Sequence, residues 1–155
     1  MNSAISRLAA AFAVLMSLSL GARAAEQSVD ITPDFVANIA KGYGSAVLQK
    51  NSKGEPVVLG RINGRAYAIL LIDCAAESCS LIQFIASLDA AGIALERVND
   101  WNDANRFGKA HLFKDKIYLT QPVVSRNGLP RQTLERYFAF WQLVLGKAKP
   151  FFQDQ

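Results

Sequence analysis

Residues 57–72, VVLGRINGRAYAILLI, decide the fold of this chain. Two apolar runs, 57–62 and 65–72, are separated by Asn63-Gly64, the pair that most strongly favours a tight β-hairpin because both residues tolerate positive φ angles. The second run is almost wholly apolar towards its end, which is typical of a strand buried in the centre of a sheet. The stretch therefore predicts an antiparallel pair of strands around which the other elements are arranged.

The segments on either side of this hairpin carry further helix and strand signals. Thr32-Pro33-Asp34 starts a helix with a hydroxyl cap, a first-turn proline and an acid. The other predicted elements are a strand at 46–48, a helix at 79–91, a polar corner at 99–105, a hairpin at 108–119 around Lys114-Asp115-Lys116, a strand broken or edged by Pro122, and a last helix at 130–145. This order predicts an α+β fold with an antiparallel sheet of about five strands, flanked by N-terminal, middle and C-terminal helices.

Apolar stripes support two of the predicted helices. In the middle helix, the stripe at i, i+3, i+4 and i+7 consists of Leu81, Phe84, Ile85 and Leu88. In the last helix, the band is wider and consists of Leu134, Tyr137, Phe138, Phe140, Trp141, Val144 and Leu145. One sheet face usually needs a narrower band, so either this helix packs over a large face or Phe140 and Leu143 contact another chain.

The N-terminal 24 residues have the pattern of a cleaved signal peptide. Arg7 precedes the apolar stretch Leu8–Leu20, and Ala22-x-Ala24 offers the small residues that a signal peptidase accepts, so cleavage is expected after Ala24. The alternative, a membrane-spanning helix, needs about 20 apolar residues, and this stretch is shorter. We therefore expect residues 25–155 to form a single domain that is periplasmic or secreted and does not insert into the membrane after cleavage.

Composition and charge exclude several classes of protein. The chain has 155 residues, of which 51% are hydrophobic, too many for a disordered protein. The formal net charge is +4, and it falls to +2 without Arg7 and Arg23 of the expected signal peptide. The remaining charge is unevenly spread, since residues 25–105 hold 6 basic and 10 acidic side chains and residues 106–155 hold 9 and 3. The basic residues are not interleaved with aromatic residues in any recognisable motif, so no nucleic-acid partner is expected. The uneven distribution of charge between the two parts of the chain instead suits self-association or an acidic partner near the last helix, close to Lys147 and Lys149.

No residue pattern points to catalysis. Cys74 and Cys79 have the spacing C-x-x-x-x-C, which favours a structural disulfide over a C-x-x-C redox centre or a metal site. His111 is the only histidine, and it lacks a marked nucleophile, so a half-buried sheet position is favoured over a small hydrolase built on it. We therefore predict no catalytic, cofactor-binding or metal-binding residue and a protein that is not an enzyme.

The segment 98–108 is the most distinctive part of the chain. Its Asn and Asp side chains suit a capped corner, in which Trp101 would plug into the core. Alternatively Trp101 lies at the surface with Arg106, because these two residue types commonly anchor partner contacts. The candidate partner contacts are therefore Trp101, Arg106, Phe140 and Leu143.

Taken together, several segments resemble the YbjN-domain family, bacterial proteins described as sensory transduction regulators. The resemblance depends on Ile62-Asn63-Gly64-Arg65, on 79–84 (CSLIQF), on 99–102 (NDWN) followed by 106–110 (RFGKA), and on Asn127-Gly128 before a helix with Trp141. It implies an α+β fold similar to type III secretion chaperones, with a curved antiparallel sheet flanked by helices, and it brings no catalytic residue.

The resemblance and the signal peptide together suggest two functions. The first is an exported, non-enzymatic YbjN-like regulatory module that contacts an unknown protein partner, with a homodimer as one option. The second is a periplasmic chaperone-like protein that holds peptides along its sheet and helices.

Overall fold

The structure, a computed structural model, describes residues 27–153. The predicted signal peptide, residues 1–24, lies outside the described residues. Two short strands, β1 (Ser28–Val29) and β8 (Leu129–Pro130), pair with each other. The main sheet consists of β2 (Ser45–Lys50), β3 (Pro56–Ile62), β4 (Arg65–Ala75), β5 (Ser78–Asp89), β6 (Lys109–Phe113) and β7 (Lys116–Val124). The helices are α1 (Pro33–Lys41), α2 (Leu95–Ala104) and α3 (Arg131–Gln153).

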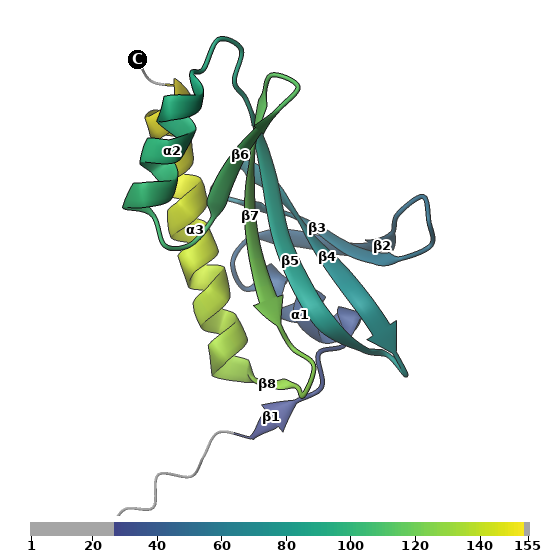
Figure 1. Ribbon diagram of the computed structural model, residues 1–155. Helices are drawn as coiled ribbons and strands as arrows, with labels where there is room; N and C mark the ends of the chain where they lie inside the picture. Colours follow the sequence, from purple (N-terminus) through teal and green to yellow (C-terminus); the bar gives the residue numbers. More distant parts are fainter. Residues whose placement is uncertain (1–26, 154–155) are drawn as a thin grey trace, which may run out of the picture.

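The main sheet is antiparallel, curved and unclosed, with the strand order β2-β3-β4-β5-β7-β6 (Figure 1). The hairpin predicted at 57–72 is confirmed, since Ile62 pairs with Arg65 across a turn in which Asn63 and Gly64 have φ angles of 50° and 77°. The α+β class is also confirmed, with six strands in the main sheet where about five were expected.

The middle helix predicted at 79–91 is wrong, because this segment is the strand β5. In the middle of this strand every second residue is buried, as Ile82, Phe84 and Ala86 show. β5 pairs with β4 on one side and with β7 on the other. The turn before it is Ala76-Glu77, with φ angles of 47° and 71°, so it lacks the glycine or asparagine that would reveal a hairpin in the sequence. The polar corner expected at 99–105 is also wrong, because residues 99–104 belong to α2 and Asn105 follows the helix as its C-cap.

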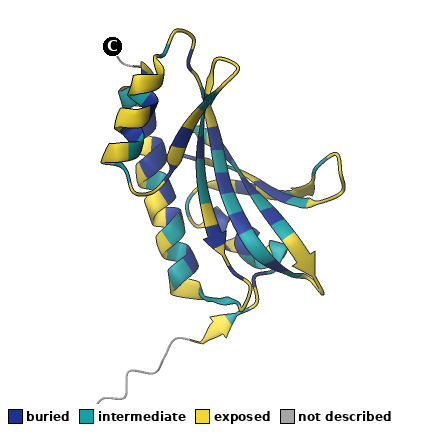
Figure 2. Ribbon diagram, viewed as in Figure 1, coloured by how far each residue is buried: buried dark blue, intermediate teal, exposed yellow. Residues whose placement is uncertain are grey.

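Helices cover only one face of the sheet. Figure 1 shows α1 behind β4 and β5 and α3 along the side of β6 and β7, and Figure 2 shows buried positions alternating along the strands. Phe84 of β5 contacts Phe138 and Trp141 of α3, with ring centroids 5.0 and 5.6 Å apart. All three rings are almost completely buried, and burial of such side chains stabilises a fold by about 1.5–3 kcal/mol each. No helix among residues 27–153 covers the opposite face, which we call the open sheet face.

The last helix extends eight residues beyond its predicted end at Leu145, because its C-terminal turns have their own partners. Ala148 and Phe152 are buried, and the Arg97 guanidinium donates to the Phe151 carbonyl oxygen at 2.8 and 3.2 Å. Pro150 removes one helical hydrogen bond near the end, at a point where Gly146 is exposed and its carbonyl can be solvated. Although α3 has 23 residues, neither it nor another helix within residues 27–153 is long and apolar enough to cross a membrane.

Tyr67 gives the fold a predicted pH dependence. Burial raises the pKa of its hydroxyl from 10.0 to about 12. The unfolded chain therefore loses this proton first, and the free energy of unfolding should fall as the pH rises from about 10 to about 12. Tyr67→Phe should remove this component. Urea midpoints of both proteins at pH 8 and pH 11 test it, and equal losses between the two pH values would refute the assignment to Tyr67.

Candidate functional site

The side chain of Asn102 completes the outer edge of the sheet. From α2, its amide oxygen accepts the Ala110 backbone N–H at 2.8 Å, and its amide nitrogen donates to the Ala110 carbonyl at 2.9 Å. Ala110 lies in β6, the edge strand, so these two bonds replace those of a missing neighbour strand. Lys109 also reaches back to the carbonyl oxygens of Asn102 and Asn105. The distinctive segment 98–108 therefore joins α2 to the sheet edge.

Trp101 is a core residue and not a surface contact. It is 1% exposed, and its indole N–H donates to the Gly108 carbonyl oxygen at 2.8 Å. Its ring also lies 5.2 Å from those of Phe151 and Phe152, which hold the end of α3. The alternative in which Trp101 plugs into the core is the one the structure shows, and the candidate partner contact at Trp101 is wrong because the ring is not accessible.

The bonds of Asn102 lead to a prediction for its isosteric variant. Asn102→Asp keeps the shape and the acceptor but loses the N–H that bonds the Ala110 carbonyl. We expect the free energy of unfolding to fall by about 1–3 kcal/mol, because a part-buried acceptor loses its partner and faces a carboxylate. Chemical denaturation measures the change. Asn99→Asp, at an exposed position of the same helix, is the control, and an equally small effect of both variants would contradict the role of Asn102.

The other three candidate contacts lie together at the surface. We use the name α3 patch for Arg106, Phe107, Phe140, Leu143 and Lys147, which line a hollow of about 210 Å³ between the end of α2 and the middle of α3. Phe107 and Phe140 stack with centroids 4.5 Å apart and planes at 7°, although each is more than a third exposed. Leu143 is 59% exposed. The α3 patch is thus an apolar surface with two cations, Arg106 and Lys147, at its edge.

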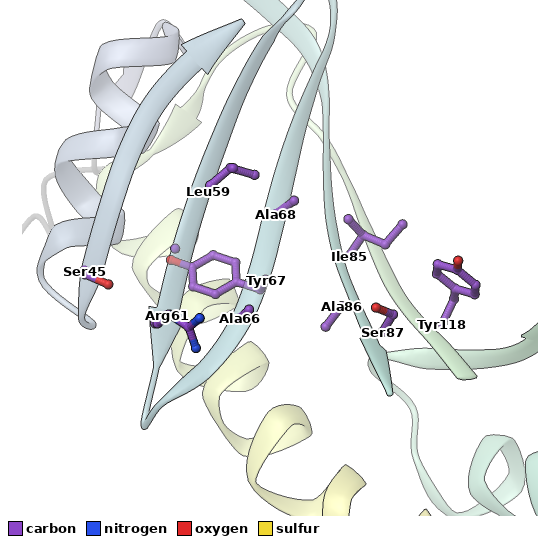
Figure 3. A pocket seen from close by; sticks show the side chains of 11 residues that line it. Ser45, Leu59, Arg61, Ala66, Tyr67, Ala68, Ile85, Ala86, Ser87 and Tyr118 are labelled. Carbon is purple, nitrogen blue, oxygen red and sulfur yellow. The ribbon is translucent and has the colours of Figure 1, made fainter. Parts of the chain in front are cut away.

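The open sheet face carries a second hollow, of about 510 Å³ (Figure 3). Its lining residues come from β2, β3, β4, β5 and β7 and are Ser45, Leu59, Gly60, Arg61, Ala66, Tyr67, Ala68, Ile85, Ala86, Ser87 and Tyr118. Most of them are apolar or small, and Arg61 supplies the single full charge while donating to the Gly64 carbonyl. This hollow is suited to contact with an apolar surface rather than to acid–base chemistry.

The sequence of the chain matches a known protein family. A sequence model of the YbjN family matches residues 32–154, from the cap of α1 through α3. The chain belongs to the YbjN family. That family carries the description "Putative bacterial sensory transduction regulator". Comparison with curated proteins gave no match.

The cysteines of this YbjN protein form the predicted disulfide. Cys74 and Cys79 are bridged across the β4–β5 hairpin, directly before the Ala76-Glu77 turn. The bridge joins two strands, where the sequence suggested a strand and a helix. Its position holds together a turn in which both central residues have positive φ angles.

His111 lies on β6 of this YbjN domain, as a sheet residue, but its side chain is exposed and not half-buried as expected. Its ring stacks on that of Tyr118 of β7 with centroids 5.3 Å apart, so His111 has a structural role as one member of a cross-strand pair. Among residues 27–153, no group of three or more His, Cys, Asp or Glu side chains is arranged to hold a metal ion.

Proposed function

We propose that this YbjN protein is an exported, non-enzymatic module that acts through protein–protein contacts, with the α3 patch as the contact surface. The observation that carries the proposal is the exposed stack of Phe107 and Phe140 beside Leu143. Aromatic and arginine residues commonly dominate binding energy at interfaces, and this patch joins two phenylalanines to Arg106. The family's description as a regulator is compatible with such a role.

Two features support export. The N-terminal segment has the arginine, the apolar stretch and the small residues of a signal peptide. The Cys74–Cys79 bridge is typical of an oxidising compartment, because cytosolic thiols are kept reduced. An exported chain that begins at Ala25 is the product we expect on N-terminal sequencing of a periplasmic or secreted fraction.

Photo-crosslinking tests the contact surface. Phe140 and, in a separate protein, Phe113 are replaced by p-benzoylphenylalanine, since the two are 39% and 54% exposed but lie on different surfaces. Phe113 lies on β6 beside Tyr118 of the open sheet face. The proposal predicts a discrete crosslinked protein from Phe140 and none from Phe113. Crosslinks from Phe113 alone, or from neither site, would count against the α3 patch.

The open sheet face favours a second candidate function, a periplasmic chaperone-like protein that binds peptides. Its hollow is mainly apolar, and Val47 and Leu59 on β2 and β3 are 62% and 41% exposed. An exposed apolar surface of this kind can hold an unfolded segment. An excess of protein should then suppress the aggregation of a reduced, denatured client, and crosslinks should come from Phe113. No suppression at molar excess would exclude this function.

A further inference from the structure

The exposed side of α3 carries a stripe in which cations frame an apolar centre. Arg136, Phe140, Leu143 and Lys147 follow one another at spacings of four, three and four residues, so they share one side of the helix. All four are exposed. Arg106 lies towards the Lys147 end, because it lines the same hollow as Lys147 and Arg136 does not line that hollow. With a rise of 1.5 Å per residue, the stripe is about 16 Å long, or three helical turns.

The cations of this stripe have no acidic partner within residues 27–153. The two ion pairs there are Lys116–Asp89 and Arg131–Glu135, and both lie outside the stripe. Arg136 donates to the side-chain oxygen of Gln132 at 2.9 Å, which leaves its positive charge uncompensated. The stripe is therefore a positively charged surface with an apolar middle.

We propose that this stripe binds an acidic amphipathic helix of a partner protein. The inference rests on the proposed function and adds the chemistry of the partner. Apolar side chains of such a helix would pack on Phe140 and Leu143, as in other helix-in-groove contacts. Acidic side chains at the two ends of the same face would meet Arg136 at one end and Lys147 and Arg106 at the other.

A second copy of this chain fits the stripe poorly. A two-fold axis through the apolar centre would set two α3 helices antiparallel, which places Arg136 of each copy opposite Lys147 of the other. Like charges in such positions oppose association. The apolar centre therefore favours a different protein over the homodimer suggested by the sequence.

An anionic membrane surface also fits poorly. α2 packs against the end of α3 (Figure 1), where the ring of Trp101 contacts that of Phe151. The carboxylates of Glu96, Asp100 and Asp103 on α2 are exposed. A flat anionic surface broad enough to reach the stripe would approach these carboxylates as well. A single helix, about 10 Å wide, can follow the stripe alone.

Binding of designed peptides tests the proposal. Two helical peptides of about 20 residues share one leucine face, flanked by glutamates in one and by lysines in the other. The purified protein should bind the glutamate peptide and not the lysine peptide. Arg136→Glu with Lys147→Glu should weaken binding at least about tenfold, whereas the charge-matched control Lys50→Glu with Lys53→Glu, on exposed lysines of the β2–β3 hairpin, should bind like the parent protein.

Several results would overturn the proposal. They are absent binding of the glutamate peptide, equal binding of both peptides, and unchanged affinity in the Arg136→Glu/Lys147→Glu protein. Stronger binding to phosphatidylglycerol vesicles than to the glutamate peptide would replace it with a membrane surface, and a dimer disrupted by Leu143→Gln would replace it with a second copy. A partner that crosslinks to Phe140 but is unaffected by the charge reversal would preserve the proposed function and reject this inference alone.

Discussion

Trp101→Ala is expected to lower the free energy of unfolding by about 3–5 kcal/mol, the range typical for removing a large buried aromatic side chain. The loss has two sources in this fold. The indole fills the space between α2 and the end of α3, where it meets Phe151 and Phe152, and its N–H satisfies the Gly108 carbonyl. Chemical denaturation of the two proteins measures the difference.

Trp101→Phe separates these two contributions. The phenyl ring keeps part of the packing but leaves the buried Gly108 carbonyl without its donor, so a smaller loss of about 1–3 kcal/mol is expected. If Trp101→Ala cost less than 1 kcal/mol, the packing of α2 on α3 described above would be incorrect.

Gly108→Ala should also be strongly destabilising, with an expected loss of about 2–5 kcal/mol. The φ angle at Gly108 is +65°, which disfavours residues with a Cβ, and a Cβ placed there would overlap both methyl groups of Val144. Left-handed backbone costs roughly 1–2 kcal/mol for such a residue, and overpacking adds about 1–3 kcal/mol.

Gly54→Ala is the matched control for this prediction. Its φ angle is +81°, but a Cβ there meets nothing within 4 Å, so only the backbone cost of about 1–2 kcal/mol is expected. The difference between the two variants in thermal or urea unfolding therefore reports the overlap with Val144. Equal losses would show that α3 does not press on the start of β6 as described.

The elements that could be predicted from the sequence are those with strong local signals. The Asn63-Gly64 turn set the register of β3 and β4, and the Thr32-Pro33 start of α1 was confirmed by a hydrogen bond from the Phe35 N–H to the Thr32 hydroxyl. The hairpin at Lys114-Asp115-Lys116 was also confirmed, with both Lys114 and Asp115 at positive φ.

β5 could not be predicted because its apolar spacing indicated a helix and the turn before it lacks a hairpin signal. The helical spacing of four apolar residues is a coincidence; they are Leu81, Phe84, Ile85 and Leu88. In the strand, Phe84 faces the helices while Ile85 lines the open sheet face. The Ala76-Glu77 turn lacks the residues that favour positive φ, so the hairpin depends on long pairing with β4 and on the Cys74–Cys79 bridge. Such tertiary support is not visible in local sequence.

The candidate site was predicted in part. The width of the apolar band on the last helix left two alternatives, a large packed face or contact of Phe140 and Leu143 with another chain, and both side chains are exposed. Phe107 was missed, because its stack with Phe140 joins residues 33 positions apart in the sequence. Trp101 was placed among the contacts although its neighbours 102–110 give it a structural role, which only the hydrogen bonds of Asn102 and Gly108 make clear.

We propose that the α3 patch binds a partner while the fold does not depend on it. Leu143→Gln and Leu95→Gln test it, because both leucines are 59% exposed on helices and glutamine has nearly the same helix propensity as leucine. The decisive measurement is the amount of partner recovered with each variant at matched protein concentration, with unfolding curves recorded for both. We predict unfolding free energies within about 0.5 kcal/mol of the parent for both variants, and at least about tenfold less partner with Leu143→Gln alone. Full recovery with Leu143→Gln, or equal loss with both variants, would show that the α3 patch is not the contact surface.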